Sequence, residues 1–329
     1  MRAFVTGGTG LVGKQLVRRL LADGHDMRFL VRDASRGEEL ARAGARPVLG
    51  DLDRLETFRE AAASSDVVFH CAAQTGFWNV PWEEFRRVNV DGTRNVLEAA
   101  AGGARPRVVH ASTVFVYGHC NADSRPRSET DAAGVGLGGY ERSKLEAEEV
   151  ALSYARERGV DVKIARLTSI YGAEGKFIPT LADGLREGRL KLIGDGSNRK
   201  HVTHVSDCVE GLIRTSARGR PGAVYNIGAA EVPTMAEIVA VAAEALGQPP
   251  PPSVPRPLAR ALATVMEVAS RLTGKPPPLT RAMVDYLSLH NAYDVSRARQ
   301  ELGFVAAVGH REGIAAAIRE YRAGLSEAA

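Results

Sequence analysis

Short apolar runs alternate with amphipathic segments along the first half of the chain. The amphipathic segments, in which apolar positions recur with helical spacing, cover 11–22, 54–63, 82–101 and 144–158. The apolar runs have the length of strands and fall at 3–6, 27–31, 47–49, 67–71, 108–111 and 162–167. Strands that alternate with helices predict a parallel sheet. Because continuous apolar strands are typical of a sheet covered on both faces, we predict an α/β fold with a doubly wound parallel sheet.

The pattern changes in the second half, where helical segments dominate. Helical spacing over 176–189, 206–217 and 234–246 alternates with short strand patterns at 190–193, 202–205 and 224–227. Two proline clusters, at 249–252 and 276–278, bracket one more amphipathic segment. Its apolar stripe consists of Leu258, Leu262, Val265, Met266, Ala269 and Leu272. The second half therefore predicts a smaller, mainly helical unit.

Composition excludes several classes of protein. The 329 residues include 43 Lys and Arg and 39 Asp and Glu, which gives a net charge of +4, and 44% are hydrophobic. These near-average values exclude a disordered chain, a collagen and a coiled coil. The small, scattered positive charge is not the basic stripe of a nucleic-acid-binding protein, so we expect no nucleic-acid partner.

Cysteine and histidine spacing indicates no metal site. Cys71, Cys120 and Cys208 form no CxxC pair, and the eight histidines include no HExxH motif. No apolar run approaches the roughly 18 residues of a membrane span. A strand pattern begins at Met1 and leaves no room for a signal peptide, so we expect a cytoplasmic protein.

A glycine-rich turn joins the first strand to the first helix. Gly7, Gly10 and Gly13 are spaced as Gly-x-x-Gly-x-x-Gly. Glycine lets the chain turn tightly and approach a pyrophosphate, whose charge the helix N-terminus attracts. The turn therefore predicts a dinucleotide site that includes Thr9, Leu11 and Val12.

The end of the second strand distinguishes between the two nicotinamide cofactors. Arginine there suits the 2′-phosphate of NADP(H), whereas an acidic residue binds the ribose 2′-hydroxyl of NAD(H). Arg32 follows this strand and Arg36 lies nearby, while Asp33 comes 20 residues after Gly13. We favour NADP(H) and keep NAD(H), bound through Asp33, as the alternative. Asp51 and Leu52 follow the third strand, where they would hold the adenine or Asp51 would cap a helix.

A second group of polar residues predicts proton transfer. Tyr140 and Lys144 stand four residues apart and would share one face of a helix. An ammonium beside a phenol lowers its pKa, so the pair is a candidate general acid/base for a carbonyl or an alcohol. Ser112 and Thr113 end a strand, from which a hydroxyl would bind the substrate oxygen.

Together these motifs resemble an extended short-chain dehydrogenase/reductase of the NAD-dependent epimerase/dehydratase superfamily. The branch most similar contains 3β-hydroxysteroid dehydrogenases and bacterial 3-oxoacyl (2-alkyl-3-oxoalkanoate) reductases. The resemblance also draws on the segments 50–52, 70–73, 89–93, 116–118 and 298–304. It implies a Rossmann domain over 1–173, completed by about 199–232, and a substrate-binding region over 174–198 and 233–329. It also implies a homodimer, formed by helices at roughly 82–101 and 140–158.

The resemblance assigns roles to individual residues. Tyr140 would be the catalytic acid/base, and Lys144 would bind the nicotinamide ribose. Thr113, with Ser112 as the alternate, would bind the substrate oxygen, and Asn89 would pack near the site. The chain reads Leu167 where the family usually has proline, yet this segment would still flank the nicotinamide. The remaining residues implied to contact the cofactor are Cys71, Ala72, Ala73, Gln74, Ala111, Leu167, Thr168, Ser169 and Ile170.

The substrate stays open between two classes. Phe77 and Trp78 would form an apolar wall of the cleft, and Phe177 would contribute to it. Lys200 stands where many epimerases place a pyrophosphate-binding arginine, and lysine lacks the bidentate fork. The stripe within 256–275 would be a lid, a peripheral membrane contact or an ordinary packing element.

These observations favour an oxidoreductase that interconverts a secondary alcohol and a ketone on a hydrophobic substrate. A nucleotide-sugar epimerase or dehydratase with tightly bound NAD is the first alternative. A non-catalytic NADP-sensing protein is the second, against which the complete set of Thr113, Tyr140 and Lys144 argues, since a sensor needs no proton transfer.

Overall fold

A seven-stranded parallel sheet forms the larger half of the molecule. The computed structural model describes residues 1–328 except 77–78, 104, 119–124 and 135–136. The strand order is β10-β6-β5-β4-β1-β2-β3, and every pair is parallel. The strands are β1 (Arg2–Thr6), β2 (Asp26–Val31), β3 (Arg46–Leu49), β4 (Val67–His70), β5 (Arg107–Thr113), β6 (Val162–Leu167) and β10 (Val224–Ile227). The predicted doubly wound α/β sheet is confirmed.

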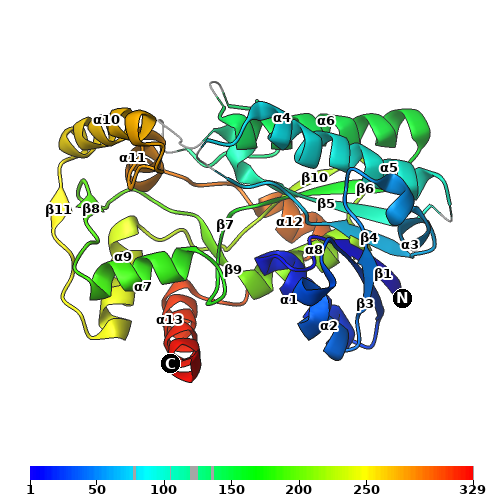
Figure 1. Cartoon of the computed structure of the whole chain (residues 1–329), viewed down its shortest axis with the longest axis horizontal. Helices are drawn as coiled ribbons and strands as arrows, with labels where there is room; N and C mark the ends of the chain where they lie inside the picture. Colours follow the sequence, from blue (N-terminus) through cyan, green and yellow to red (C-terminus); the bar gives the residue numbers. More distant parts are fainter. Residues whose placement is uncertain (77–78, 104, 119–124, 135–136, 329) are drawn as a thin grey trace.

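Helices cover both faces of this sheet (Figure 1). One face packs on α1 (Leu11–Ala22), α2 (Glu38–Arg42), α8 (Val205–Arg218) and α12 (Ser296–Leu302). The other packs on α3 (Arg59–Ala63), α5 (Gly92–Ala101) and α6 (Gly139–Arg158). The central strand β4 is buried along its whole length, as expected when apolar side chains point to both faces.

The smaller half is mainly helical. Its core lies among α7 (Phe177–Arg186), α9 (Met235–Leu246) and α13 (His310–Ala328). Two short sheets adjoin this core: β7 (Ser169–Tyr171) pairs with β9 (Val202–His204), and β8 (Leu192–Ile193) pairs with β11 (Ser253–Val254). The proline-bracketed segment forms α10 (Arg256–Thr273) at the outer edge of this half, and α11 (Arg281–Ser288) follows beneath it (Figure 1).

Three features differ from the sequence pattern. The helix expected over 54–63 is divided into η2 (Leu55–Thr57) and α3, with Phe58 between them. The helix expected over 82–101 consists of α4 (Trp82–Phe85), a π-helix η3 (Arg86–Asp91) and α5. The segment around α12, expected in the substrate-binding region, contributes Ala298, Leu302 and Phe304 to the core of the larger half. The remaining short helices are the 3-10 turns η1 (Ala34–Gly37) and η4 (Val114–Tyr117).

Among the residues that the structure describes, no helix has the length and apolar character needed to span a membrane.

Candidate active site

The glycine-rich turn between β1 and α1 has the geometry of a phosphate cradle. Gly7 has φ +72°, and a Cβ there would lie 2.6 Å from Ala72 N. A Cβ at Gly13 would lie 2.2 Å from Gly7 O, so both positions require glycine. Gly10 is the N-cap of α1, whose first turn contains no acidic residue. The amides of Leu11, Val12 and Gly13 at this positive helix end fit a dinucleotide pyrophosphate.

In the turn after β2, the two basic residues and the acidic residue differ in their partners. Arg32 and Arg36 are exposed, and neither forms an ion pair with another described residue. Asp33 is the N-cap of η1 and accepts hydrogen bonds from Ser35 N at 3.0 Å and Ser35 Oγ at 2.9 Å. These two hydrogen bonds lower the pKa of Asp33. One oxygen of its carboxylate, Oδ1, is therefore already engaged within its own turn.

Asp51 and Leu52 lie in the turn that follows β3. Asp51 Oδ1 accepts a hydrogen bond from Leu52 N at 2.7 Å. Leu52 is buried, and its O accepts from Asn95 Nδ2 at 2.7 Å. The alternative that Asp51 caps a helix is wrong, because the next helix, η2, has Arg54 at its N-cap and no side-chain cap hydrogen bond. Asp51 instead accepts at its backbone O from Arg54 N at 3.0 Å.

The loop after β4 is held by backbone contacts from two sides. Cys71 N donates to Thr6 O at 3.1 Å, and Ala72 N donates to Thr6 Oγ1 at 3.3 Å. Further along, Gln74 N donates to Asn89 Oδ1 at 2.7 Å, and Asn89 Nδ2 donates to Gln74 O at 3.0 Å. This places 71–74, with Ala73 between the two anchors, directly beside the glycine-rich turn.

Asn89 connects that loop to the helix that carries the candidate acid/base. Its Nδ2 also donates to Ser143 Oγ at 2.7 Å, and the side chain is buried. Asn89 lies on the π-helix η3, and such single-turn π segments often occur at functional sites because they redirect one side chain. The expectation that Asn89 packs near the site fits this position.

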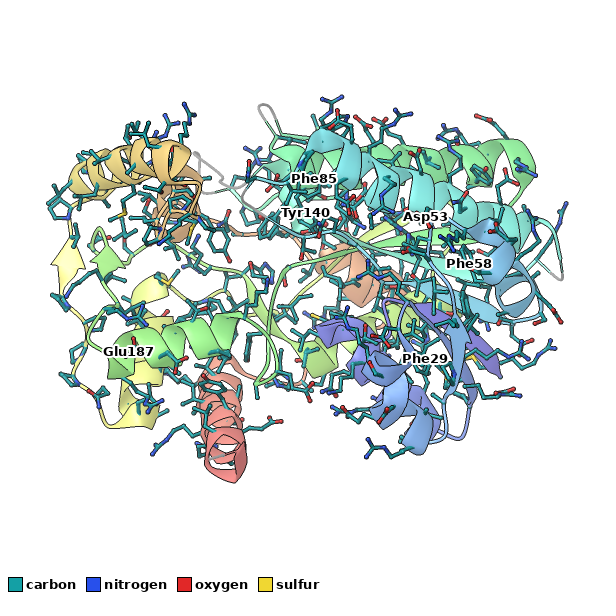
Figure 2. The ribbon with its side chains drawn as sticks, in the orientation of Figure 1. Phe29, Asp53, Phe58, Phe85, Tyr140 and Glu187 are labelled. Carbon is teal, nitrogen blue, oxygen red and sulfur yellow. The ribbon has the colours of Figure 1, made fainter. Side chains whose placement is uncertain are left out.

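Tyr140 and Thr113 meet between the end of β5 and the start of α6. Tyr140 lies near Phe85, on the side of the larger half that faces the smaller one (Figure 2). Burial raises the pKa of Tyr140 above its usual value of 10, and the charge of Glu141 adds to this. A side-chain hydrogen bond with Thr113 acts in the opposite direction. Tyr140 is therefore a protonated phenol at neutral pH.

Lys144 is buried one turn further along α6. Its Nζ donates to Ala111 O at 2.8 Å and lies 3.2 Å from His110 Nε2. Burial lowers the pKa of Lys144 to about 8, while Glu148 and Cys71 oppose the shift. The sequence predicted that Lys144 lowers the pKa of Tyr140. In the structure the net shift of the Tyr140 pKa is upward, because burial and the charge of Glu141 outweigh the hydrogen bond with Thr113.

Two buried histidines stand behind Lys144, and the sequence reasoning missed both. Thr6 Oγ1 donates to His70 Nδ1 at 2.7 Å, and His70 Nε2 donates to Thr93 Oγ1 at 2.9 Å. These bonds assign the proton of His70 to Nε2, because the Thr93 hydroxyl itself donates to Asn89 O. The ring centroids of His70 and His110 are 5.1 Å apart. The signal that could have found them is one histidine in each of two apolar strands that pair in register, His70 at the end of β4 and His110 within β5.

Ser112 points away from Tyr140 into a buried ion pair. Its Oγ donates to Glu148 Oε1 at 2.5 Å, and Glu148 pairs with Arg166 at 2.6 Å. Arg166 Nη1 in turn donates to Tyr117 Oη at 2.6 Å. Because successive side chains of a strand alternate in direction, Thr113 and Ser112 cannot both face the site. The structure brings Thr113, not the alternate Ser112, to Tyr140.

The segment after β6 runs between the two halves. Thr113 of β5 is paired in register with Leu167 of β6. Thr168 is buried and hydrogen-bonded to Thr203 Oγ1 at 2.6 Å. Ser169 Oγ lies 2.9 Å from Tyr286 Oη, and Ile170 packs against the sheet core. This segment therefore lies beside Thr113, at the carboxyl edge of the sheet.

Tyr286 of α11 is a further residue of this region that the sequence reasoning did not select. Its ring makes an edge contact with Phe115, with centroids 5.7 Å apart. The buried Lys200 places Nζ 4.2 Å from the centroid of the same ring. Tyr286 thus connects Lys200 to the segment that follows Thr113. No periodicity marks it, since only the folded position of α11 brings it there.

The other predicted substrate residues are less informative. Phe177 begins α7 and packs against the core of the smaller half. Phe77 and Trp78 lie outside the described residues. Within the described part of the chain, no cluster of His, Cys, Asp or Glu could hold a metal ion.

Comparison with known proteins identifies the family. Residues 3–228 match the model of the NAD dependent epimerase/dehydratase family. The chain belongs to this family. It is an NAD(P)-dependent enzyme of the extended short-chain dehydrogenase/reductase type, as the motifs indicated.

Epimerase/dehydratase relatives match the chain almost from end to end. A 4-hydroxy-2-methyl-3-oxo-4-farnesyl-3,4-dihydroquinoline-1-oxide ketoreductase from Stigmatella aurantiaca is 33% identical over 322 residues, which are 95% of each chain. A 2-alkyl-3-oxoalkanoate reductase from Stenotrophomonas maltophilia is 30% identical over 95% of this chain and 97% of the reductase. The structure of DesIV, a dTDP-glucose 4,6-dehydratase from Streptomyces venezuelae with bound NAD, has a TM-score of 0.81 at 26% identity and covers 99% of this chain and 98% of its own.

Proposed function

We propose that this epimerase/dehydratase-family protein is an NADP(H)-preferring ketoreductase that interconverts a ketone and a secondary alcohol on a hydrophobic 3-oxoacyl-type substrate. The observation that carries the chemistry is the contact between Thr113 and Tyr140, with the buried Lys144 one helical turn away. Hydride exchange with the substrate carbon is the chemistry that a bound nicotinamide supplies. The chain must then provide or remove one proton at the substrate oxygen.

Tyr140 is suited to donate that proton. Its raised pKa keeps the phenol protonated at neutral pH, so it acts as the acid when a ketone is reduced. Thr113 donates a hydrogen bond to the same oxygen as negative charge develops on it. Lys144, an ammonium below its pKa of about 8, stabilises the phenolate that Tyr140 leaves behind. In alcohol oxidation the proton moves in the opposite direction, and Tyr140 acts as the base.

The cofactor preference rests on the turn after β2. The guanidinium groups of Arg32 and Arg36 are exposed and without ion pairs among the described residues, whereas Asp33 is engaged by Ser35. A 2′-phosphate would find two bidentate donors there. A 2′-hydroxyl would compete with Ser35 for the Asp33 carboxylate or use its second oxygen. This arrangement supports NADP(H) over NAD(H).

The hydrophobic substrate class is supported by the relatives and by α11. Both reductases above are named for substrates that carry an alkyl or farnesyl chain, and their matches cover 95% of this chain. Phe115 and Tyr286 place aromatic surface beside Thr113 and Ser169. Aromatic walls with a few fixed polar groups are typical of sites for apolar ligands.

A nucleotide-sugar dehydratase is the second candidate, favoured by the full-length likeness to DesIV. Such an enzyme would hold NAD(H) and return the hydride to the same sugar. Lys200 argues against this candidate. It stands where many epimerases have a pyrophosphate-binding arginine, and a lysine offers a point charge instead of the two parallel hydrogen bonds of a guanidinium.

A turnover screen with both cofactors tests the proposal. A 2-alkyl-3-oxoalkanoate, a 3-oxosteroid and dTDP-glucose are each offered with NADPH and with NADH, and absorbance at the nicotinamide band is followed. We expect net NADPH oxidation with the alkyl substrate. Sugar conversion without net cofactor oxidation would instead establish the dehydratase.

A further inference from the structure

The helix α10 is mounted with its small side chains inward and its large ones outward. Ala259 and Ala263 are buried against Val284 of α11 and Ile193 of β8. Val265 is 67% exposed and Leu272 is 84% exposed. The remaining exposed large apolar side chains of this helix and of α11 are Leu258, Leu262, Val268 and Met283. An ordinary packing helix would bury these residues rather than expose them.

The outward face of α10 carries no charge. At 100° per residue, Leu258, Leu262, Val265, Val268 and Leu272 fall within about 120° of one another, together with Ala261 and Ala269. We call these seven residues the α10 apolar face. Contiguous apolar surface of this kind on a folded protein marks a site of interaction.

The charges around this face are predominantly basic. Between 256 and 288 the chain has five basic and two acidic side chains, a net charge of +3 out of +4 for the whole chain. Both acids are already paired, since Arg256 and Arg260 share Asp285 and Arg281 holds Glu267. Arg271 and Lys275 flank the C-terminal end of the helix and are exposed. The surroundings of the α10 apolar face are therefore complementary to an anionic partner.

We propose that the α10 apolar face docks on an anionic lipid membrane surface, with the helix axis in the plane of the interface. An apolar face bordered by Lys and Arg is the signature of helices that lie in the headgroup region. A second copy of the chain fits less well, because a two-fold contact would bring +3 against +3. This docking is independent of the proposed ketone reduction, although it would hold the enzyme where apolar substrates dissolve.

Co-sedimentation with lipid vesicles tests the docking. The full-length protein is mixed with vesicles of phosphatidylcholine alone, or with about one-third phosphatidylglycerol, at low and high salt. We expect binding to the anionic vesicles that weakens with salt, since each basic residue near the surface contributes about fivefold in affinity. Arg271→Ala combined with Lys275→Ala should lower binding about 25-fold.

Matched substitutions show whether vesicle binding depends on the α10 apolar face or on exposed apolar side chains in general. Val265→Ser with Leu272→Ser should lower vesicle binding at least tenfold. Val305→Ser with Leu49→Ser removes a valine and a leucine that are also well exposed, at 60% and 65%, from elsewhere and should leave binding unchanged. Circular dichroism and thermal melting verify that each variant is folded.

Three outcomes would overturn the proposal. The first is no binding to anionic vesicles, and the second is binding that the Val265/Leu272 variant retains or that neutral vesicles match. The third is a change in oligomeric state of that variant by sedimentation velocity without lipid, which would assign the face to a second copy.

Discussion

Burial raises the pKa of Tyr140, because the enclosure of its phenol outweighs the hydrogen bond with Thr113. Tyr140→Phe removes only the hydroxyl and should lower kcat by roughly 100- to 10,000-fold with cofactor affinity retained. Tyr154→Phe is the matched control, since Tyr154 lies on the same helix α6 as Tyr140 but donates its hydroxyl to Glu98 of α5, outside the site. Steady-state kinetics and cofactor titration measure both variants. Near-normal turnover of Tyr140→Phe would refute the assignment.

Arg32 tests cofactor choice at a single side chain. Arg32→Ala should weaken NADPH binding by about 10- to 150-fold and leave NADH binding nearly unchanged, because only NADPH has the 2′-phosphate. Arg42→Ala, which removes an exposed arginine paired with Glu38, should affect neither cofactor. Fluorescence titration with each dinucleotide gives the affinities. Equal losses for both cofactors would favour the NAD(H) alternative.

Lys144 predicts the alkaline limb of the pH profile. Its pKa is lowered to about 8 by burial, so the ammonium predominates below this pH and is lost above it. Stabilisation of the Tyr140 phenolate should fade accordingly, and kcat/KM for ketone reduction should fall above about pH 8. A profile that stays flat to pH 10 would show that the charge of Lys144 is not needed.

At the scale of elements, His70 ties strand β4 to β1 through Thr6 and to α5 through Thr93. Burial, with the charge of Lys144, lowers the pKa of His70 to about 3, against 6.5 when exposed. Between pH 3 and pH 6.5, His70 is therefore protonated in the unfolded chain and neutral in the folded chain. This stability contribution is complete above pH 6.5 and is lost as the pH falls toward 3.

His70→Gln should flatten that acid dependence. Between pH 6 and pH 4 the slope of unfolding free energy against pH should decrease by about 1.4 kcal/mol per pH unit. Denaturant unfolding at several pH values measures the slope, which does not depend on any constant loss of stability. An unchanged slope would mean that His70 titrates normally in the folded protein.

The regular elements could be predicted because their signals are local. The glycine spacing of the β1–α1 turn and the apolar strands β4 and β5 carry their structure in a few consecutive residues. The π-helix at Arg86–Asp91 could not be predicted, since a single extra residue per turn barely alters helical periodicity. For α10 the periodicity revealed the apolar stripe but not its direction, which depends on what Ala259 and Ala263 pack against.

The candidate site shows the same division. Tyr140 and Lys144 are four residues apart, so helix geometry alone places them together. Thr113 and Ser112 remained alternatives, because only the position of Glu148 shows which hydroxyl is turned away. Tyr286 comes from a helix 173 positions beyond Thr113 and has no local signal.

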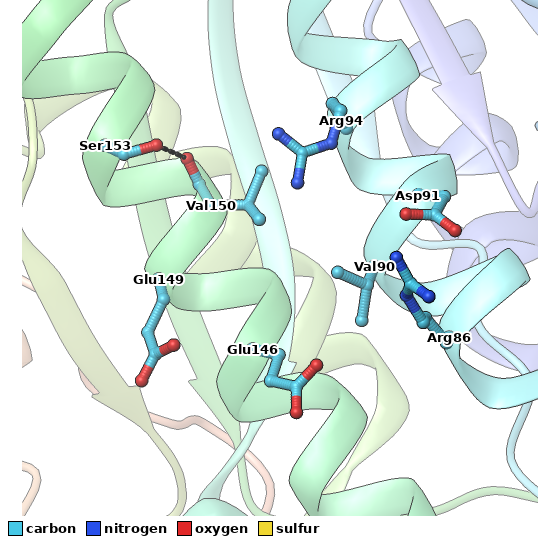
Figure 3. A pocket seen from close by; sticks show the side chains of 8 residues that line it. All are labelled: Arg86, Val90, Asp91, Arg94, Glu146, Glu149, Val150 and Ser153. Carbon is cyan, nitrogen blue, oxygen red and sulfur yellow. Dashed lines mark hydrogen bonds between the residues drawn. The ribbon is translucent and has the colours of Figure 1, made fainter. Parts of the chain in front are cut away.

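For the whole molecule, a groove between α6 and the continuous helical segment of η3 and α5 bears on the expected homodimer (Figure 3). The cavity of about 430 Å³ is bordered by Arg86 and Arg94, with Asp91, on one side and by Glu146 and Glu149 on the other. A two-fold axis along this groove would set the arginines of one protomer against the glutamates of its partner. We therefore propose this face as the dimer contact.

A charge reversal tests the dimer. Arg94→Glu and Glu149→Arg should each raise the dimer dissociation constant at least tenfold, whereas the double variant should recover most of the affinity. Sedimentation equilibrium at low salt measures the constants. A monomeric wild-type protein, or single variants with unchanged association, would contradict the contact.

The larger half is completed by segments from the second half of the chain, and this has a consequence during synthesis. Strand β10 completes the sheet beside β6, and α12 with Phe304 completes the core around Leu16. A nascent chain that has emerged as far as Leu167 therefore has an open strand edge and an unfilled hydrophobic core. At about 5–20 residues per second, translation to Phe304 takes on the order of ten seconds. During this interval the ribosome-bound intermediate offers apolar surface to chaperones, and slowed translation within this stretch should increase its aggregation.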